Sequence, residues 1–384
     1  MLKYITIFFL LLIISCTETV EKNIEQHYPN FPVKKDTTLH YAKRFSISEN
    51  EKFKLIYLFG NVDIKDTTAI YVILKDSTLQ LKKLKNEFIF KTTCKKIASL
   101  SSVYTNMFCE LKALQNVYAI ENIDYYNNAE IINKFKNHQL VELVKGPEID
   151  VEKTIVLKPD IIFSFGMGNP EKDSNKKITQ ANIPTVICLD HLEETPLARA
   201  EWIKFYASFV GKEKLADSIF KSIEKNYLQL KELAKTAKTQ PTIFTEIKYG
   251  DVWYVPGGKS FVANLIKDAN ADYVFKYDAH TGSLNLSFED VYLKAKDADY
   301  WLNPAMVNSK KEILGFELRY AEFKAYKTGN LYNNNKIVNG KGFSNYWETG
   351  IIYPDKVLSD LILIFHPEIK PELKSELYYY KKIE

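Results

Sequence analysis

The segment between Gly211 and Pro241 constrains the fold more than any other part of the sequence, because it contains neither glycine nor proline. Apolar residues recur in it at the i, i+3, i+4, i+7 spacing of an amphipathic helix. The spacing predicts a helix over 213–237, which would be roughly 37 Å long at 1.5 Å per residue. A coiled coil is the alternative, but the pattern lasts only about three turns. A helix of this length spans a small domain, so the rest of the chain must be arranged along it.

Strand and helix patterns alternate on both sides of this segment. On the N-terminal side we expect strands at 97–100, 117–120, 160–165 and 185–189, and helices at 105–114, 151–157 and 172–181. On the C-terminal side we expect strands at 242–247 and 300–302, and helices at 261–269, 288–295 and 355–365. Such alternation is typical of a parallel sheet covered by helices.

Residues 41–95 differ, since short β-like runs separated by turn residues replace the alternation. We therefore predict an α/β fold class, with two Rossmann-like α/β lobes bridged by one long rigid helix and an N-terminal β-rich extension. The expected boundaries are 41–198 for the N-terminal lobe (with 41–95 its β-rich part), 199–238 for the inter-lobe helix and 239–384 for the C-terminal lobe. Whether 41–95 forms a separate module or adds strands to the first lobe stays open.

The first sixteen residues indicate export. Lys3 precedes an apolar run from Ile5 to Ile14, which is shorter than the roughly 20 residues that a bilayer span requires. The run ends in Ser15-Cys16 and resembles a bacterial lipobox, which implies that residues 1–15 are a lipoprotein signal peptide and that Cys16 is the lipidation site. An uncleaved anchor or a buried N-terminal helix is the alternative. Residues 16–40 are polar and fit a tether, so we expect a protein that is lipid-anchored to a membrane of the bacterial cell envelope, with its body in the periplasm or at the surface.

Charge and cysteine content exclude some classes of function. Lys and Arg number 52 against 48 Asp and Glu, a balance that argues against nucleic acid as the partner. Cys94, Cys109 and Cys188 show no C-x-x-C spacing, so we interpret them as core cysteines rather than a metal or redox site. We expect a monomer.

Catalytic motifs are missing from the sequence. It contains no G-x-S-x-G, H-E-x-x-H or G-x-G-x-x-G, and the run from Gly257 to Ser260 lacks the first glycine of a phosphate-binding loop. The six histidines are scattered singly. His191 follows a predicted strand and could bind a metal, but a solvated loop histidine is the commoner case. We therefore predict neither an enzyme nor a resident metal or cofactor.

Several motifs nevertheless resemble one family in their order and spacing. They are LKPDII at 157–162, TPLARAEW at 195–202, VPGGKSF at 255–261 with LIKDANADY at 265–273, GSLNLSFE at 282–289 with AKDADYW at 295–301, and YWETG at 346–350 with PDKVLSDL at 354–361 and HPE at 366–368. Together they resemble the ABC-transporter substrate-binding lipoproteins for ferric siderophores, haem and cobalamin, over about residues 41–384. The resemblance implies two lobes that close on a metal chelate with little hinge motion and deliver it to an ABC permease.

The resemblance also suggests how the protein would dock on its permease. Members of the family typically dock through one glutamate on each lobe. The matching positions here are Asn106 and Lys267. The carboxylates nearest to them, Glu110 and Asp268, are therefore the predicted permease-docking residues.

The ligand site is expected beyond the carboxyl ends of the parallel strands. Aromatic faces can stack on a planar chelate, and arginine can pair with its carboxylates. The predicted ligand-binding residues are Tyr104, Met167, Arg199, Tyr249, Trp253, Tyr254, Phe343 and Trp347. Core packing is the alternative role for each aromatic residue, and filling space is the alternative for Met167.

Two classes of function stay open. The first is a binding lipoprotein that feeds an importer of iron complexes or cobalamin. The second uses the same lobes as a metal-ion receptor, which needs three or four converging His, Asp or Glu ligands, or as a surface lipoprotein with hydrolytic activity, which needs a nucleophile and its base.

Overall fold

The computed structural model describes residues 34–35, 39–63, 66–81, 87–145, 148–167, 173, 175–369 and 376–384. The predicted signal peptide 1–15, Cys16 and nearly all of the predicted tether 16–40 lie outside these ranges. Within them, no helix is both long enough and apolar enough to cross a bilayer.

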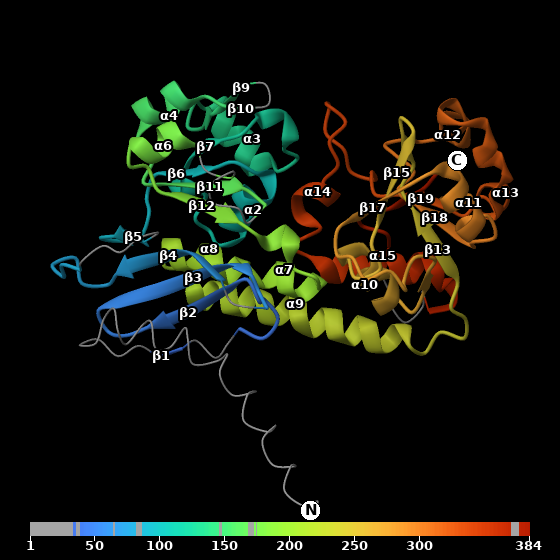
Figure 1. Ribbon diagram of the computed structural model, residues 1–384, viewed down its shortest axis with the longest axis horizontal. Helices are drawn as coiled ribbons and strands as arrows, with labels where there is room; N and C mark the ends of the chain where they lie inside the picture. The colour runs from blue at the N-terminus through green and yellow to red at the C-terminus, as the bar shows by residue number, and fades with distance from the viewer. Residues whose placement is uncertain are drawn as a thin grey trace, which may run out of the picture.

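The N-terminal lobe is built on a five-stranded sheet that is parallel throughout, in the order β12-β11-β6-β7-β8. Helices cover this sheet on the left of Figure 1. The strands are β6 (Ile97–Ser99), β7 (Val117–Ile120), β8 (Val141–Glu142), β11 (Ile161–Phe165) and β12 (Thr185–Cys188), with the short hairpin β9 (Val144–Lys145) and β10 (Glu148–Ile149) beside them. The helices are α2 (Ser102–Glu110), α3 (Ala129–Lys136), α4 (Val151–Leu157) and α6 (Lys176–Gln180).

The C-terminal lobe holds a second five-stranded sheet, in the order β16-β13-β18-β19-β20, in which only the last pair is antiparallel. A smaller antiparallel sheet, β14-β15-β17, lies at the side of this lobe that faces the N-terminal lobe (Figure 1). The strands are β13 (Thr242–Thr245), β14 (Lys248–Tyr249), β15 (Val252–Pro256), β16 (Asp272–Tyr273), β17 (Ser283–Leu286), β18 (Tyr300–Leu302), β19 (Leu331–Asn333) and β20 (Lys381–Lys382). The helices are α10 (Phe261–Asp268), α11 (Phe288–Ala295), α12 (Lys310–Phe316), α13 (Lys324–Thr328), α14 (Tyr346–Thr349) and α15 (Pro354–Phe365).

Three consecutive helices connect the lobes, where the sequence predicted one helix over 199–238. They are α7 (Pro196–Glu201), α8 (Ile203–Val210) and α9 (Glu213–Ala234). Gly211 separates α8 from α9 with φ +66°, a left-handed conformation that glycine adopts without steric cost. The long helix α9 begins at Glu213, where the apolar spacing predicted its start, and it packs on α8 at one end and along α15 in the C-terminal lobe (Figure 1).

The β-rich extension forms a sheet of its own rather than extra strands on the first lobe. Its order is β1-β2-β3-β4-β5, antiparallel except for the last pair. The strands are β1 (Lys34–Lys35), β2 (Phe45–Glu49), β3 (Phe53–Asn61), β4 (Asp66–Leu74) and β5 (Glu87–Phe90). One face packs on α8, where Phe45 meets the ring of Phe205 at 5.3 Å and Tyr71 meets that of Phe209 at 5.6 Å. The extension is thus held to the lobe by aromatic contacts with a linking helix.

Two buried carboxylates fix the chain between β1 and β2 of this sheet. Glu201 on α7 accepts hydrogen bonds from the backbone N–H groups of residues 40, 41 and 42, at 2.8 to 3.3 Å. Glu193 accepts from those of residues 43 and 44 and from Trp202 Nε1. A buried carboxylate needs such donors, because an unpaired charge in the interior is costly. The segment that leads into β2 is therefore tied to α7.

A hydrogen-bonded polar chain is buried at the carboxyl ends of β6 and β7. Ser99 Oγ accepts from Thr105, whose hydroxyl lies 2.8 Å from that of Tyr126, and Tyr126 donates to Glu121 Oε2 at 2.6 Å. Burial raises the pKa of Glu121 to about 8, although the bond from Tyr126 favours its charged form. This chain fixes the segment after β7, which the C-terminal lobe contacts.

Breaking α9 should weaken the connection between the lobes. Ile223 is buried on α9, so Ile223→Ala is expected to cost about 2 to 5 kcal/mol of stability. Ile223→Pro should cost about 3 kcal/mol more, because proline removes a helical hydrogen bond. Chemical denaturation of both variants measures the difference. Equal stability of the alanine and proline variants would contradict a continuous helix at this position.

Glu121 should make the stability of the fold depend on pH. Its folded-state pKa of about 8 lies above the value of an ordinary glutamate, so the folded protein holds this proton more tightly than the unfolded chain does. The resulting stability is present at pH 4.5 and is lost as the pH rises to 8. Glu121→Gln should therefore melt at a higher temperature than the parent at pH 8 and lose little at pH 5. Exposed Glu152→Gln is the control, and an unchanged pH slope in Glu121→Gln would refute the assignment.

Candidate functional site

The carboxyl ends of the two large parallel sheets meet at the boundary between the lobes. Residues that follow β7 in the N-terminal lobe contact residues that follow β19 in the C-terminal lobe. Asn339 Nδ2 donates to the carbonyl oxygens of Asp124 and Tyr126 at 2.8 and 3.0 Å. In open α/β sheets this is the edge at which ligands bind.

Glu348, on α14, is the central residue of this contact. Its side chain is 1% exposed, and its carboxylate accepts hydrogen bonds from three groups of the N-terminal lobe. These are Asn106 Nδ2 at 2.8 Å and the backbone N–H groups of Asn127 at 2.8 Å and Asn128 at 3.2 Å. The two lobes are therefore joined directly beyond β7.

The carboxyl end of β11 presents exposed apolar surface instead. Phe165, the last residue of β11, is 53% exposed, and Met167 is 64% exposed. The ring of His191 lies 4.2 Å from that of Phe165, and neither of its nitrogens has a hydrogen-bond partner among the described residues. Burial, with help from Arg199 and Arg44, lowers the pKa of His191 to about 4. A neutral imidazole thus extends the apolar surface of Phe165.

Arg199 lies between the lobes on α7. Its guanidinium donates to the carbonyl oxygens of Glu193, at 3.3 Å, and of His191, and it lies 4.5 Å from the centre of the Phe261 ring. Burial lowers the pKa of Arg199, whereas the nearby Asp190 and Tyr346 raise it. Arginine stays charged at neutral pH even so, and it places a cation at the lobe boundary.

The C-terminal lobe adds aromatic and acidic groups. Tyr346 is buried, and its ring lies 5.0 Å from that of Trp347, which is 54% exposed. Glu246 follows β13 with φ +65°, a conformation that costs energy for a residue other than glycine and is common at functional sites. Burial raises its pKa to about 7, against the effect of a hydrogen bond with Asn303.

Arg199 on α7 contacts groups of both lobes. On the N-terminal side it donates to the carbonyl oxygen of His191, whose ring contacts Phe165. On the C-terminal side it lies over the ring of Phe261, and Tyr346, whose ring contacts that of Trp347, influences its pKa. Two of the predicted ligand-binding residues, Arg199 and Trp347, thus lie at the lobe boundary, and their role in binding stays a prediction.

Three further predicted ligand-binding residues are exposed aromatics. Tyr249 pairs with Val252 across the β14–β15 hairpin, and Tyr254 lies two residues further along β15, so both tyrosines share one face of the small sheet. They are 83% and 46% exposed. Phe343 is 41% exposed and contacts the ring of Tyr125 of the N-terminal lobe at 4.8 Å. Their role in binding stays a prediction.

Two predicted ligand-binding residues are core residues instead. Trp253 has no exposed surface, because alternation along β15 turns it away from the face of Tyr254 and onto Trp301 and Phe323. Tyr104 is 2% exposed and stacks on Tyr206 at 5.6 Å. The prediction that these two side chains line a pocket is wrong.

The predicted docking carboxylates are also engaged within the protein. Asp268 accepts from Tyr227 at 2.7 Å and pairs with Lys231 at 2.8 Å, both on α9, which leaves its side chain 11% exposed. A permease arginine would have to displace both partners, and docking by Asp268 stays a prediction. Glu110 bonds to Tyr353 across the lobe boundary, and its docking role stays a prediction.

Local sequence patterns hardly indicate Phe165, Glu246 and Glu348. Phe165 lies inside a predicted strand, whereas ligand-binding residues are expected after strand ends. The strained backbone at Glu246 exists only in the folded lobe, and Glu348 bonds to Asn106, which lies 242 positions away. No local sequence pattern could therefore indicate either residue. His191 was considered as a metal ligand, but the described residues contain no group of three His, Cys, Asp or Glu that could hold a metal ion.

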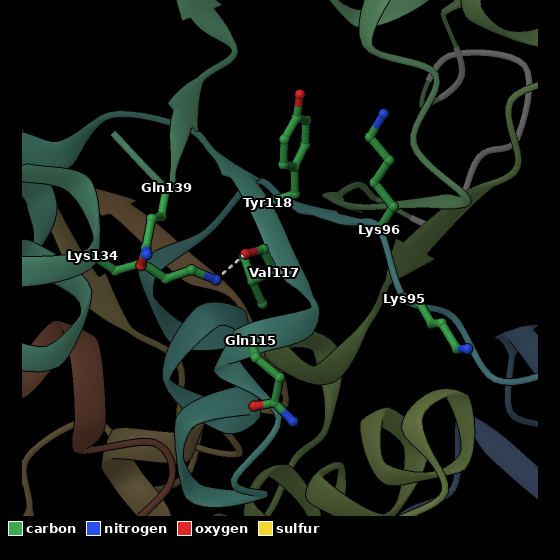
Figure 2. Close-up of a pocket in the computed structure, with 7 residues that line it drawn as sticks. All are labelled: Lys95, Lys96, Gln115, Val117, Tyr118, Lys134 and Gln139. Carbon is green, nitrogen blue, oxygen red and sulfur yellow. Dashed lines mark hydrogen bonds between the residues drawn. The ribbon is translucent and has the colours of Figure 1, made fainter. Parts of the chain in front are cut away.

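A basic hollow lies at the opposite edge of the first sheet. It measures about 540 Å³ and is lined by Lys95, Lys96, Gln115, Val117, Tyr118, Lys134 and Gln139 (Figure 2). Lys134 donates to the carbonyl oxygens of Leu114 and Val117 at 2.6 and 2.5 Å, and Lys96 donates to that of Leu157. Two of its three ammonium groups are therefore engaged by the backbone.

Comparisons with known proteins agree with this architecture. Residues 97–336 match the model of the periplasmic binding protein family. An uncharacterized lipoprotein of Methanocaldococcus jannaschii is 32% identical over 256 residues, which cover 63% of this chain and 58% of that relative.

Two solved structures share the fold. The periplasmic haem-binding protein RhuT from Roseiflexus has a TM-score of 0.55 at 16% identity, covering 71% of this chain and 98% of its own. An ABC-type Fe3+-hydroxamate transport system structure from Saccharomonospora viridis has a TM-score of 0.55 at 15% identity, covering 72% and 95%. The family consists of binding proteins rather than enzymes. With its two α/β lobes and its linking helix, and with the family's model matched over most of the folded body, the chain belongs to the periplasmic binding protein family.

Proposed function

We propose that this protein is the lipid-anchored substrate-binding component of an ABC importer and that it captures a metal chelate of the siderophore, haem or cobalamin type. The observation that supports this most is the environment of Arg199, which lies 4.5 Å from the centre of the Phe261 ring and donates to the carbonyl oxygen of His191, whose ring contacts the exposed Phe165. A cation beside aromatic faces suits a planar or ring-bearing ligand with carboxylate groups.

A chelate suits these residues better than a bare metal ion. A receptor for the ion would need three or four converging ligands, and no group of three His, Cys, Asp or Glu suited to an ion occurs in the parts of the chain that the structure describes. His191, the best placed histidine, packs against Phe165, and its pKa is lowered to about 4. The two solved structures with the same fold also favour a chelate, since one is a haem-binding protein and the other belongs to a ferric hydroxamate transport system.

Glu246 suggests a second requirement on the ligand. Its carboxyl raises the pKa of Tyr346, whereas Arg199 lowers it. With a pKa of about 7, Glu246 exists as both acid and carboxylate near neutral pH. A ligand that carries hydrogen-bond donors as well as anionic groups would match both residues.

The proposal also includes a lipid anchor and delivery to a permease. The lipobox-like run that ends at Cys16 supports the anchor, and family membership supports delivery to a permease. A protein that carries a ligand to a membrane complex is expected to act as a monomer in the cell envelope. Glu110 is the remaining candidate for docking on the N-terminal lobe.

Removing the exposed tryptophan should weaken binding while the fold survives. Trp347→Ala is expected to cost about 1 to 3 kcal/mol of affinity, the usual loss of an aromatic anchor. Isothermal titration with haemin and with a ferric trihydroxamate as probes measures this loss. Tyr277→Ala, at a side chain that is 90% exposed on another loop, is the matched control. If at least one probe binds the parent protein and Trp347→Ala binds it equally well, the ligand does not contact this residue.

Replacing Cys16 tests the anchor separately. If the thiol is acylated, Cys16→Ser should abolish the incorporation of labelled palmitate and move the protein to the soluble fraction, because durable anchoring needs roughly two acyl chains. The double variant of Cys16→Ser with Cys109→Ser should behave like Cys16→Ser alone. Retention of the serine variant in the membrane fraction would contradict lipidation at this residue.

A further inference from the structure

Residues 337–349, named the latch here, cross from the C-terminal lobe to the segment after β7. Ser344 and Val338 form a β-bridge that makes residues 338–344 a small hairpin. Asn339 holds this hairpin together, since its Oδ1 accepts from the backbone N–H groups of Lys341 and Phe343 at 2.9 and 3.1 Å. The latch is thus a preformed unit that ends in α14.

The same asparagine reaches across the lobe boundary with its other side-chain atom. Asn339 Nδ2 donates to Asp124 and Tyr126, and in return Asn127 Nδ2 donates to the carbonyl oxygen of Phe343 at 3.1 Å. Lys341 lies 3.7 Å from the carboxylate of Asp124. Contacts therefore run in both directions across the boundary.

Glu348 is the buried end of the latch. Its carboxylate accepts from Asn106, Asn127 and Asn128, and Asn128 Nδ2 also donates to Asn106 Oδ1 at 2.8 Å. Hydrogen bonds to an ionised acceptor are about twice as strong as neutral ones. Since these donors all belong to one lobe and the acceptor to the other, separating the lobes at this edge breaks all the bonds to Glu348 together.

All partners in this contact are groups of the protein itself, so the contact needs no ligand. The strand ends of β11 and β12 behave differently. Within the described ranges, Phe165 and Met167 make no hydrogen bond, ion pair or ring contact with the C-terminal lobe, and both side chains are more than half exposed. The two halves of the lobe boundary are therefore unequal.

We propose that the latch holds the β7 half of the lobe boundary shut in the absence of ligand, so that ligand enters and leaves only beside β11 and β12. Asn339 and Glu348 act as positioning residues that set the spacing of the lobes. The proposal does not depend on which ligand is bound, and it can fail while the proposed function stands.

Two isosteric variants test the latch. Asn339→Asp keeps the acceptor that holds the hairpin but replaces the donor by an oxygen that faces two carbonyl oxygens. Glu348→Gln places an amide N–H₂ against the donors of the N-terminal lobe. Asn330→Asp is the matched control, because Asn330 Nδ2 donates to the carbonyl oxygen of Asp299 at 3.1 Å within the C-terminal lobe.

The readout is the distance between spin labels on the two lobes, measured by double electron–electron resonance on the full chain without ligand. Lys136→Cys on α3 and Lys311→Cys on α12 carry the labels, since both side chains are exposed and both helices lie at the upper edge of their lobes in Figure 1. Cys16 and Cys109 are replaced by serine in every sample, and Cys94 and Cys188 are buried.

The parent protein and Asn330→Asp should show one narrow distance distribution. Asn339→Asp and Glu348→Gln should show a longer and broader one with helix content unchanged by circular dichroism. A parent distribution as broad as that of the variants, or folded variants that keep the parent distance, would overturn the proposal. If Glu348→Gln does not fold, Asn339→Asp decides alone, because its hairpin lies at the surface.

Discussion

The burial of α8 is the constraint on which the rest of the structure depends. Every residue from Ile203 to Val210 is buried, with the sheet of the extension on one side and α2 of the N-terminal lobe close by. Apolar burial of this extent is the dominant favourable term in folding. Because α9 follows after a single left-handed glycine and packs along α15, the position of α8 also sets that of the C-terminal lobe.

The burial of α8 also determines where the candidate functional residues lie. Arg199 lies on α7, directly before α8, and α7 is fixed by the carboxylates of Glu193 and Glu201 that bind the entering chain. The lobe boundary then divides into two parts. Hydrogen bonds to Glu348 join the lobes beyond β7, whereas exposed Phe165 and Met167 remain accessible beyond β11. The proposed capture of a ligand rests on this combination of a half-buried cation, Arg199, and an accessible apolar surface.

Local patterns in the sequence predicted most elements and the fold class. The expected helices at 151–157 and 288–295 have the bounds of α4 and α11, since caps and periodicity act within one turn. The sequence did not predict the hairpin of β14 and β15 or helix α3. As a result Trp253 was placed on a loop, although strand alternation buries it. The contacts of Glu348 and Asp268 join distant segments, so no local pattern could indicate them.

Native mass spectrometry of the protein purified from its own host tests the central claim most directly, because it identifies what occupies the site without assuming a ligand. The account predicts an added mass of several hundred daltons, with the isotope pattern of a metal held in an organic chelate, that is released when the protein unfolds. A bare metal ion bound with no organic component would contradict it.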